Sequence, residues 1–260
     1  MQNTFSNGIP KTIHYCWFGG KPLPELAEKC IASWRRFCPG FEIRRWDESN
    51  FDLNSCDYIR EAYEAEKWAF VSDYARFWIL YNYGGVYFDT DVELIKPLDP
   101  ILEKGGFMGV EVAPGDFVGG NDDLIVNPGL GIAIAKGDSF YGEILAYYQR
   151  IHFMMPDGSP NLMTVGSHVT ELLKANGLKN ENSLQIVRGI SIYPKCYFNP
   201  MNMNSGKLEI TDDTVSIHHY AATWVNRKTR VRDGVFRFIY RVFGEKVAEA
   251  MKKAYRKISK

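Results

Sequence analysis

The twelve residues from 81 to 92, Tyr-Asn-Tyr-Gly-Gly-Val-Tyr-Phe-Asp-Thr-Asp-Val, constrain the fold more than any other stretch of the chain. The run 86–88 predicts a buried strand, because β-branched and aromatic side chains pack well on a pleated surface. Side chains alternate along a strand, so Asp89 and Asp91 are expected to point to the same side. Two such carboxylates repel each other unless a cation joins them, and hard oxygen ligands suit Mg²⁺ or Mn²⁺. The stretch therefore predicts metal-assisted handling of a diphosphate.

The residues before this stretch predict a long helix. Apolar side chains recur at helical spacing from 67 to 80, and Gly84 stands where a left-handed C-cap is expected. Asp73 and Arg76 lie one turn apart on one face of that helix. As a surface ion pair they would contribute little to stability. As functional groups, the carboxylate would bind sugar hydroxyls and the guanidinium would bind phosphate.

Strand and helix patterns alternate through the first half of the chain. Strands are expected at 12–17 and 41–46, and helices at 25–37, 58–67 and 72–83. This alternation predicts an α/β fold, with a mostly parallel central sheet flanked by helices on both faces. After residue 99 the pattern is looser, with helices expected at 139–152 and 165–175 and a strand at 214–219. The Gly-, Asn- and Asp-rich residues 115–131 are expected to loop over the site.

Length and cysteine usage limit the class of protein. A chain of 260 residues can bury a substantial core, and one domain is the simplest count. Five cysteines, odd in number and without a Cys-x-x-Cys pair, favour a reducing compartment over a disulfide framework. Residues 1–8 lack the basic region and apolar run of a secretion signal, and no apolar stretch is long enough to span a bilayer. We expect a cytoplasmic protein, soluble or peripheral on the inner face of the membrane.

The net charge of zero conceals an acidic body and a basic end. Residues 227–260 hold twelve Lys and Arg against three Asp and Glu, giving +9, and the rest holds nineteen against twenty-eight, giving −9. Apolar residues recur at helical spacing through this end. The pattern predicts a domain over residues 1–230, followed by a basic amphipathic extension at 231–260. Such an extension either lies on an anionic membrane surface or packs on the domain with a solvated basic face. Nothing else in the sequence indicates nucleic-acid recognition.

Three ordered motifs resemble glycosyltransferase family 32. Residues 69–76 and 84–91 resemble its sugar-binding region, which contains the Asp-x-Asp motif. Residues 13–20 resemble the opening strand and loop of these enzymes. Residues 218–224 resemble their closing His-then-Ser-Trp motif, with Thr223 in place of the usual Ser. The family includes yeast initiating mannosyltransferases and bacterial capsule and lipopolysaccharide transferases, and it is akin to the catalytic domains of clostridial glucosylating toxins.

The resemblance implies a GT-A-like domain with a Rossmann-like first half, which binds a nucleotide sugar at the carboxyl ends of its first strands. Trp17 would stack on the base, although a tryptophan there could equally fill the core. Gly19 would let the backbone approach the nucleotide closely. Ser72 and Asp73 would bind ribose and sugar hydroxyls, and Arg76 would reach the phosphates or the hexose.

The resemblance also implies a metal site. Asp91 would ligate Mn²⁺ or Mg²⁺ directly, while Asp89 would contact ribose or sugar and reach the metal through water. One histidine of the closing motif would be a further ligand, His219 being favoured over His218. Two later positions would cover the diphosphate: Thr223 and Trp224. Candidate polar groups on the acceptor side are Asn121, Asp122, Asp123 and Asn127.

The function implied is that of a metal-dependent retaining glycosyltransferase of surface polysaccharide (capsule) biosynthesis. It would transfer a hexose from a nucleotide sugar to a saccharide or lipid-linked acceptor, with UDP-sugars favoured and GDP-mannose the alternative. One competing class is an Asp-x-Asp phosphotransferase or phosphohydrolase, but residues 19–21 (Gly-Gly-Lys) are too sparse for a phosphate-binding P-loop. Another is a non-catalytic carbohydrate-binding protein, which would have no need of groups suited to a diphosphate.

Overall fold

The computed structural model describes residues 4–116, 123–202 and 205–221, together with positions 234, 235, 238–240, 242–244, 247 and 251. The elements up to the first gap are β1 (Thr12–Cys16), α1 (Glu25–Phe37), β2 (Glu42–Trp46), α2 (Asp57–Glu64), α3 (Trp68–Tyr83), β3 (Gly85–Tyr87), β4 (Val92–Leu94), α4 (Asp99–Leu102) and β5 (Phe107–Val112). Those after it are β6 (Ile125–Val126), a 3₁₀ helix (Pro128–Leu130), β7 (Ile132–Ile134), α5 (Ser139–Tyr148), α6 (Val165–Ala175), β8 (Gln185–Val187), β9 (Ile190–Tyr193), α7 (Lys195–Phe198) and β10 (Ser216–His218).

The central sheet has the strand order β2-β1-β3-β7-β5-β9-β8, with β6 paired to β5. Strands β2, β1 and β3 pair in parallel, as do β5 and β9, whereas β7, β6 and β8 pair antiparallel to their neighbours. Five of the eight strands therefore run in one direction. The predicted α/β fold with a mostly parallel sheet is confirmed. A second, antiparallel sheet pairs β4 with β10.

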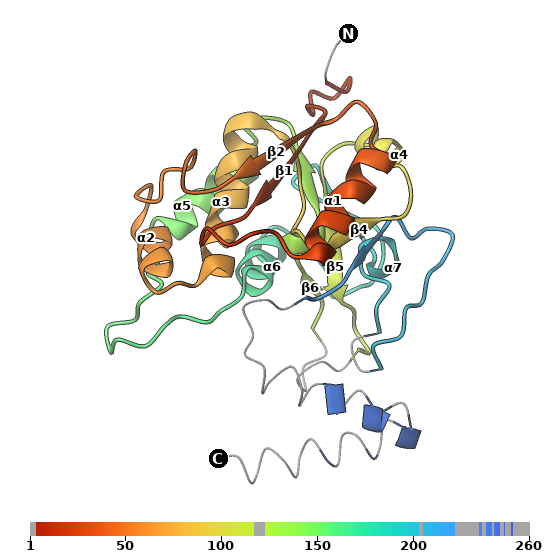
Figure 1. Cartoon of the computed structure of the whole chain (residues 1–260). Helices are drawn as coiled ribbons and strands as arrows, with labels where there is room; N and C mark the ends of the chain where they lie inside the picture. Colours follow the sequence, from red (N-terminus) through yellow and green to blue (C-terminus); the bar gives the residue numbers. More distant parts are fainter. Residues whose placement is uncertain are drawn as a thin grey trace.

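Helices cover both faces of the sheet. Figure 1 shows α2, α3 and α5 on one side and α1, α4 and α7 on the other. The alternation of side chains along the strands explains the two cores. Cys16 and Tyr87 belong to the core on the α3 side, whereas Tyr15 and Val86 belong to the core on the α1 side. None of the described helices combines the length and apolar character needed to cross a bilayer.

The predicted helices agree with the structure, with small changes at their ends. Helices α1 and α6 have the predicted bounds, and α6 begins at an N-cap, Thr164, whose Oγ1 accepts from the Ser167 N–H at 3.3 Å. Helix α2 stops at Glu64 because Glu66 has a φ of 55°, outside the helical region. Gly84 ends α3 as predicted, at a positive φ of 67°, but its ψ of −167° is not that of the expected left-handed cap. Six strands were not predicted from the sequence: β4, β5, β6, β7, β8 and β9, of which β6 lies within residues 115–131, expected to be a loop.

The Asp-x-Asp segment does not continue the strand, so strand alternation is the wrong reason for the directions of Asp89 and Asp91, although both do line one pocket. Strand β3 ends at Tyr87, and residues 89–91 form a turn that leads into β4. The Val92 N–H donates to the Asp89 carbonyl at 3.1 Å, which closes this turn. The two carboxylates therefore owe their directions to the turn. The predicted boundary at residue 230 lies outside the described residues and stays a prediction.

Candidate active site

A pocket of about 450 Å³ opens at the carboxyl ends of the strands that run in the common direction. Trp17 directly follows β1, Asp89 follows β3, and Glu111 lies near the end of β5. Ligands of open α/β sheets bind in this position, because the loops that follow the parallel strands converge there. Helix α3 forms one wall through Trp68, Ala69, Phe70, Ser72, Asp73 and Arg76.

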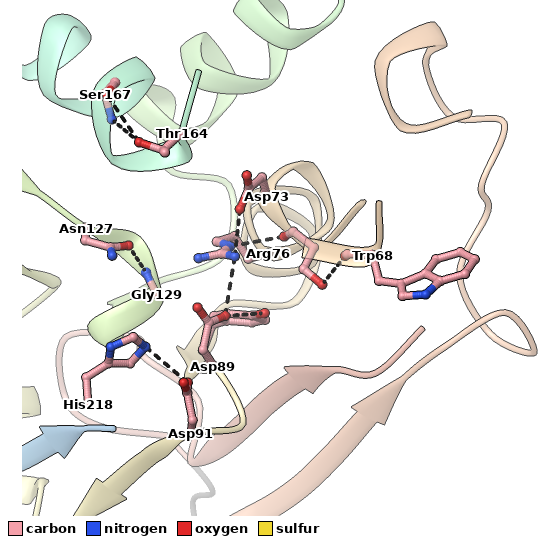
Figure 2. Close-up of polar contacts among 12 residues, drawn as sticks. Trp68, Asp73, Arg76, Asp89, Asp91, Asn127, Gly129, Thr164, Ser167 and His218 are labelled. Carbon is pink, nitrogen blue, oxygen red and sulfur yellow. Dashed lines mark hydrogen bonds and ion pairs between the residues drawn. The ribbon is translucent and has the colours of Figure 1, made fainter. Parts of the chain in front are cut away.

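Arg76 is the centre of the polar contacts in this wall (Figure 2). Its Nη2 lies 2.9 Å from Asp73 Oδ1 and 3.3 Å from Asp89 Oδ1, and its Nε donates to the Ser72 carbonyl at 3.0 Å. The guanidinium also lies over the Tyr87 ring, 5.0 Å from its centroid, and the Tyr87 hydroxyl donates to Asp89 Oδ1 at 3.0 Å. The Arg76 and Asp73 side chains are only 3% and 9% exposed. The surface-pair interpretation of these two residues is therefore wrong.

The buried group is asymmetric in charge, because two carboxylates share one guanidinium. Burial raises the pKa of Asp73 to about 7, although the charge of Arg76 lowers it and that of Asp89 raises it further. Burial likewise raises the pKa of Asp89 against the opposing charge of Arg76. For Arg76, burial lowers the pKa, but the charges of Asp89, Tyr87 and Asp73 raise it overall. Arg76 therefore stays cationic.

One donor of this buried cation has no partner among the residues that the structure describes. Arg76 Nη1 is inaccessible to solvent and makes no hydrogen bond to any described residue. A buried polar group without a partner carries a desolvation cost, so native structures seldom keep one without a reason. Because Arg76 lines the pocket, this donor can bind an anionic oxygen of a ligand there.

A second charged pair joins the Asp-x-Asp turn to the second sheet. His218 Nε2 lies 3.1 Å from Asp91 Oδ1, and the Ala221 N–H donates to Asp91 Oδ2 at 2.8 Å. Burial opposes the ionised form of Asp91, but the His218 charge and these hydrogen bonds lower its pKa to about 2. Burial also disfavours the charged form of His218, yet Asp91 raises the His218 pKa overall. Asp91 is therefore ionised at neutral pH.

The structure brings the side chain of His218, rather than that of the favoured His219, to the Asp91 carboxylate, while the His219 N–H donates to the Asp91 carbonyl at 2.9 Å. His218 is the last residue of β10 and pairs with Val92 of β4, which places it beside the turn. His219 instead contacts Glu93, with Nε2 2.8 Å from Oε2, and it does not line the pocket. The register of β10 thus separates the two histidines, and His218 is the better candidate for a metal ligand.

Asp89 and Asp91 have the donor chemistry for a divalent cation. In the described part of the chain, no three or more His, Cys, Asp and Glu side chains are gathered as a complete metal site. Mg²⁺ commonly takes only one or two protein carboxylates and completes its shell with water and substrate phosphates. His218 Nδ1 is buried without a hydrogen-bond partner among the described residues. The residues therefore fit a cation that is completed by a phosphorylated ligand.

Trp17 and Ser72 line the pocket, whereas Gly19 does not, and the contacts predicted for Trp17 and Ser72 with base and ribose stay predictions. The Trp17 indole is half-buried, and its Nε1 donates to the Lys21 carbonyl at 2.6 Å. Gly19 has a φ of 91°, and a Cβ there would lie 2.7 Å from the Trp68 indole. The glycine is therefore required by packing against Trp68, and its predicted contact with nucleotide stays a prediction.

Among the predicted acceptor-side groups, Asn127 lines the pocket. Asp123 does not, and its carboxylate lies 3.6 Å from Lys174 Nζ. Four predicted positions lie outside the described residues: Asn121, Asp122, Thr223 and Trp224. Sequence reasoning missed Glu111, a pocket carboxylate, because a single Glu in an apolar run carries no motif.

Replacing His218 with glutamine is expected to change how stability depends on pH. The His218 pKa is raised above 6.5 in the folded protein, so the folded state holds this proton to a higher pH than the unfolded state. The stabilisation is fully present below pH 6.5 and is lost as the pH rises through the folded pKa. Urea unfolding between about pH 6 and about pH 9 should show that the free energy of unfolding falls more steeply with pH in the wild type than in His218→Gln. Parallel pH profiles would contradict the assignment, and the difference should vanish in an Asp91→Asn background.

Comparison with known families confirms the resemblance in the first half of the chain. Residues 24–107 match the family described as "Glycosyltransferase sugar-binding region containing DXD motif". Inositol phosphoceramide mannosyltransferase 1 of Schizosaccharomyces pombe is 35% identical over 109 residues, which cover 38% of this chain and 33% of that protein. The uncharacterized glycosyltransferase L373 of Acanthamoeba polyphaga mimivirus is 33% identical over 106 residues, 38% of this chain and 42% of that one. The match thus spans between a third and about two fifths of the length of these relatives.

Two solved glycosyltransferase structures have a related chain trace at low sequence identity. One is a glycosyltransferase involved in glycosylation of the major capsid of PBCV-1, with 11% identity and a TM-score of 0.48 over 85% of this chain and 97% of that one. The other is the galactosyltransferase LgtC in complex with donor and acceptor sugar analogues. It has 14% identity and a TM-score of 0.44 over 84% of this chain and 91% of that one.

Proposed function

We propose that this chain, whose residues 24–107 match the sugar-binding region of the DXD glycosyltransferases, is a metal-dependent retaining hexosyltransferase that uses a nucleotide sugar. One observation carries the proposal. The buried Asp73–Arg76–Asp89 group and the Asp91–His218 pair line the same pocket as Trp17. This combines groups for a sugar, a diphosphate and a base in one site. It favours the transferase over a carbohydrate-binding protein, which has no use for the diphosphate groups.

Different residues of the pocket bind the base, the hydroxyl groups and the diphosphate of the donor. Trp17 offers an aromatic face to the base, and Ser72 and Asp73 offer hydrogen bonds to hydroxyl groups. Arg76 Nη1, which has no partner among the described residues, binds an oxygen of the diphosphate and stabilises the charge that develops as it leaves. When bound by Asp91 and Asp89, a divalent cation supplies further stabilisation of that charge.

Likeness to relatives supports two candidates for the nucleotide and sugar of the donor. The resemblance to toxin catalytic domains favours a UDP-sugar, whereas the match to a protein named a mannosyltransferase favours GDP-mannose. A thermal-stability screen of UDP- and GDP-sugars, with and without Mn²⁺, distinguishes the two. We expect one nucleotide series to raise the melting temperature in a Mn²⁺-dependent way. If no nucleotide sugar stabilises the protein, the proposed function fails.

Replacing Trp17 with alanine is expected to weaken nucleotide binding without unfolding the protein. Stacking between a base and an aromatic side chain contributes about 1–3 kcal/mol, which corresponds to roughly 5- to 150-fold in Kd. Calorimetric titration with the nucleoside diphosphate measures this change, and Trp17→Phe, which keeps an aromatic face, is the matched control. If Trp17→Ala lowers the melting temperature but leaves the nucleotide Kd unchanged, Trp17 is a core residue instead.

The basic C-terminal segment supports a peripheral membrane location, with lipid-linked acceptors of capsule-type polysaccharides as the matching substrates. Several of its described apolar side chains are more than half exposed: Val235, Phe238, Val242 and Phe243. Within this segment, where apolar residues recur at helical spacing, Gly244 has a φ of 78°, outside the helical region. Exposed apolar side chains within a segment of net charge +9 suit an anionic lipid surface.

Replacing Phe238, Val242 and Phe243 together with serine is expected to abolish sedimentation with phosphatidylserine-containing vesicles. The wild-type chain should bind these vesicles at low salt and dissociate from them at high salt, because screening weakens the attraction of basic residues for anionic lipid. A variant with Ile186 and Leu208 replaced by serine is the control, since both are exposed apolar residues elsewhere. Equal sedimentation of all three proteins, or none by the wild type, would rule out this surface.

A further inference from the structure

Glu111 differs from the other acidic residues of the pocket. Among the described residues, four carboxylates line the pocket, and three of them have partners: Asp73 and Asp89 bind Arg76, and Asp91 binds His218. Within the described residues, the Glu111 carboxylate forms neither a hydrogen bond nor an ion pair, although its charge contributes to raising the His218 pKa. Glu111 thus offers acceptor oxygens to a ligand without having to give up a protein partner.

The backbone directs Glu111 by a β-bulge. Strand β5 pairs Val110 with Val126 and Val112 with Ile125, so β5 advances two residues while β6 advances one. Glu111 is the additional residue. A bulge turns a side chain away from the direction that regular alternation would give it, and bulges are frequent next to active sites. Asn199, which is buried, donates from Nδ2 to the Glu111 carbonyl at 2.8 Å and so fixes the position of the bulge.

Asn127 supplies the complementary donor on the adjoining strand. It directly follows β6, and its N–H donates to the Gly109 carbonyl of β5 at 3.1 Å. Its Oδ1 accepts from the Gly129 N–H at 2.8 Å, an arrangement that turns the Nδ2 group away from this turn. Nδ2 makes no hydrogen bond to a described residue. A carboxylate and an amide N–H group of neighbouring strands are therefore both available in the pocket.

Asn127 lies away from the wall assigned to the nucleotide. Figure 2 shows Asn127 and Gly129 on the opposite side of Arg76 from Trp68. The same turn adjoins the reacting groups, because the Gly129 carbonyl accepts from the Asp89 N–H at 3.2 Å and a Cβ at Gly129 would lie 2.2 Å from Asp89 Oδ2. A ligand group held there would face the far end of a donor bound between Trp17 and Asp89.

We propose that Glu111, assisted by Asn127, binds a hydroxyl group of a saccharide acceptor. A sugar hydroxyl both donates and accepts hydrogen bonds, so it can donate to the Glu111 carboxylate while it accepts from Asn127 Nδ2. This assignment rests on the proposed function and extends it, because it places the acceptor between β5 and the segment after β6. Glu111 selects and orients the acceptor.

The test compares acceptor use with donor binding in the full chain. Methyl and octyl hexosides, including mannosides and glucosides, serve as probe acceptors, and nucleoside diphosphate release is followed against their concentration. We expect Glu111→Gln to raise the KM for a stimulating hexoside about tenfold or more, since a charged hydrogen bond is replaced by a neutral one. The Kd for the nucleoside diphosphate should stay within about twofold. Glu103→Gln, an exposed site on α4's C-terminal side, is the matched control and should leave both constants unchanged.

Three results would overturn the assignment. The first is an unchanged hexoside KM in a folded Glu111→Gln protein, checked by its melting temperature. The second is a nucleotide Kd that weakens as much as the KM rises, which would assign Glu111 to the donor. The third is a wild type that binds and consumes its donor but is stimulated by no hexoside, which would exclude a saccharide at this position. Failure of the wild type to bind any nucleotide sugar is a separate result, and it removes the proposed function itself.

Discussion

Asp91→Asn is expected to lower metal-dependent turnover by roughly 10²–10³-fold or more, the loss typical when a group that stabilises transition-state charge is removed. Asparagine keeps the shape of the side chain but removes the negative charge that attracts a cation. The wild-type carboxylate is ionised at neutral pH, because His218 and the Ala221 N–H lower its pKa to about 2 despite burial. Both Mn²⁺-dependent donor binding and turnover should therefore fall together.

The measurement is nucleoside diphosphate release as a function of Mn²⁺ concentration, for the wild type and Asp91→Asn. Asp212→Asn, an exposed substitution of the same kind, is the matched control and should behave as the wild type. The melting temperature of each protein shows whether the fold survives. Near-normal turnover that still responds to Mn²⁺ in Asp91→Asn would remove this residue from the metal site.

Arg76→Gln is expected to lower both the stability and the activity of the protein. Removing one partner of a buried ion pair typically costs about 3–5 kcal/mol, because an uncompensated charge stays buried. Here two carboxylates, Asp73 and Asp89, would lose their shared cation. Turnover should also be lost, since Arg76 Nη1 is the donor assigned to the diphosphate. Urea unfolding measures the loss of stability, and nucleoside diphosphate release measures the loss of turnover.

Two further variants show whether the loss has this cause. Arg60→Gln is the surface control: Arg60 also bridges two carboxylates, Asp57 and Glu64, but its side chain is largely solvated, so losing it should change the stability little. Adding Asp73→Asn to Arg76→Gln should recover part of the stability, because one of the uncompensated carboxylates is then neutral. An Arg76→Gln protein as stable as the wild type, or no recovery in the double variant, would contradict the role given to the buried pair.

The local elements of the first half could be predicted from the sequence because their causes are local. Apolar spacing and a proline-marked start give α1, and Gly84 ends α3 as its position indicates. The same spacing puts Asp73 and Arg76 on one face of α3. Whether that face is solvated or buried depends on what packs against it, namely β1, β3 and the turn after β3. No local sequence pattern shows whether this face is buried, so both the surface ion pair and the pocket site remained possible for Asp73 and Arg76.

The other half of the site depends on pairings between distant segments. Strand β10 pairs with β4 across more than a hundred residues, and the register of that pairing decides that His218 rather than His219 meets Asp91. A shift of one residue would exchange the two histidines. Glu111 is likewise defined by the bulge between β5 and β6, which arises from the pairing and has no signal in a run of apolar residues. These residues could be identified only in the folded chain.

The most direct test of the proposed function is the fate of a nucleotide sugar incubated with the full chain, followed by chromatography and by NMR of the product. We expect release of a nucleoside diphosphate with transfer of the hexose in the same anomeric configuration. The reaction should require Mn²⁺ or Mg²⁺ and stop when the metal is chelated. Release of inorganic phosphate in place of a nucleoside diphosphate, or no consumption of any UDP- or GDP-sugar with metal and hexoside acceptors present, would contradict the account.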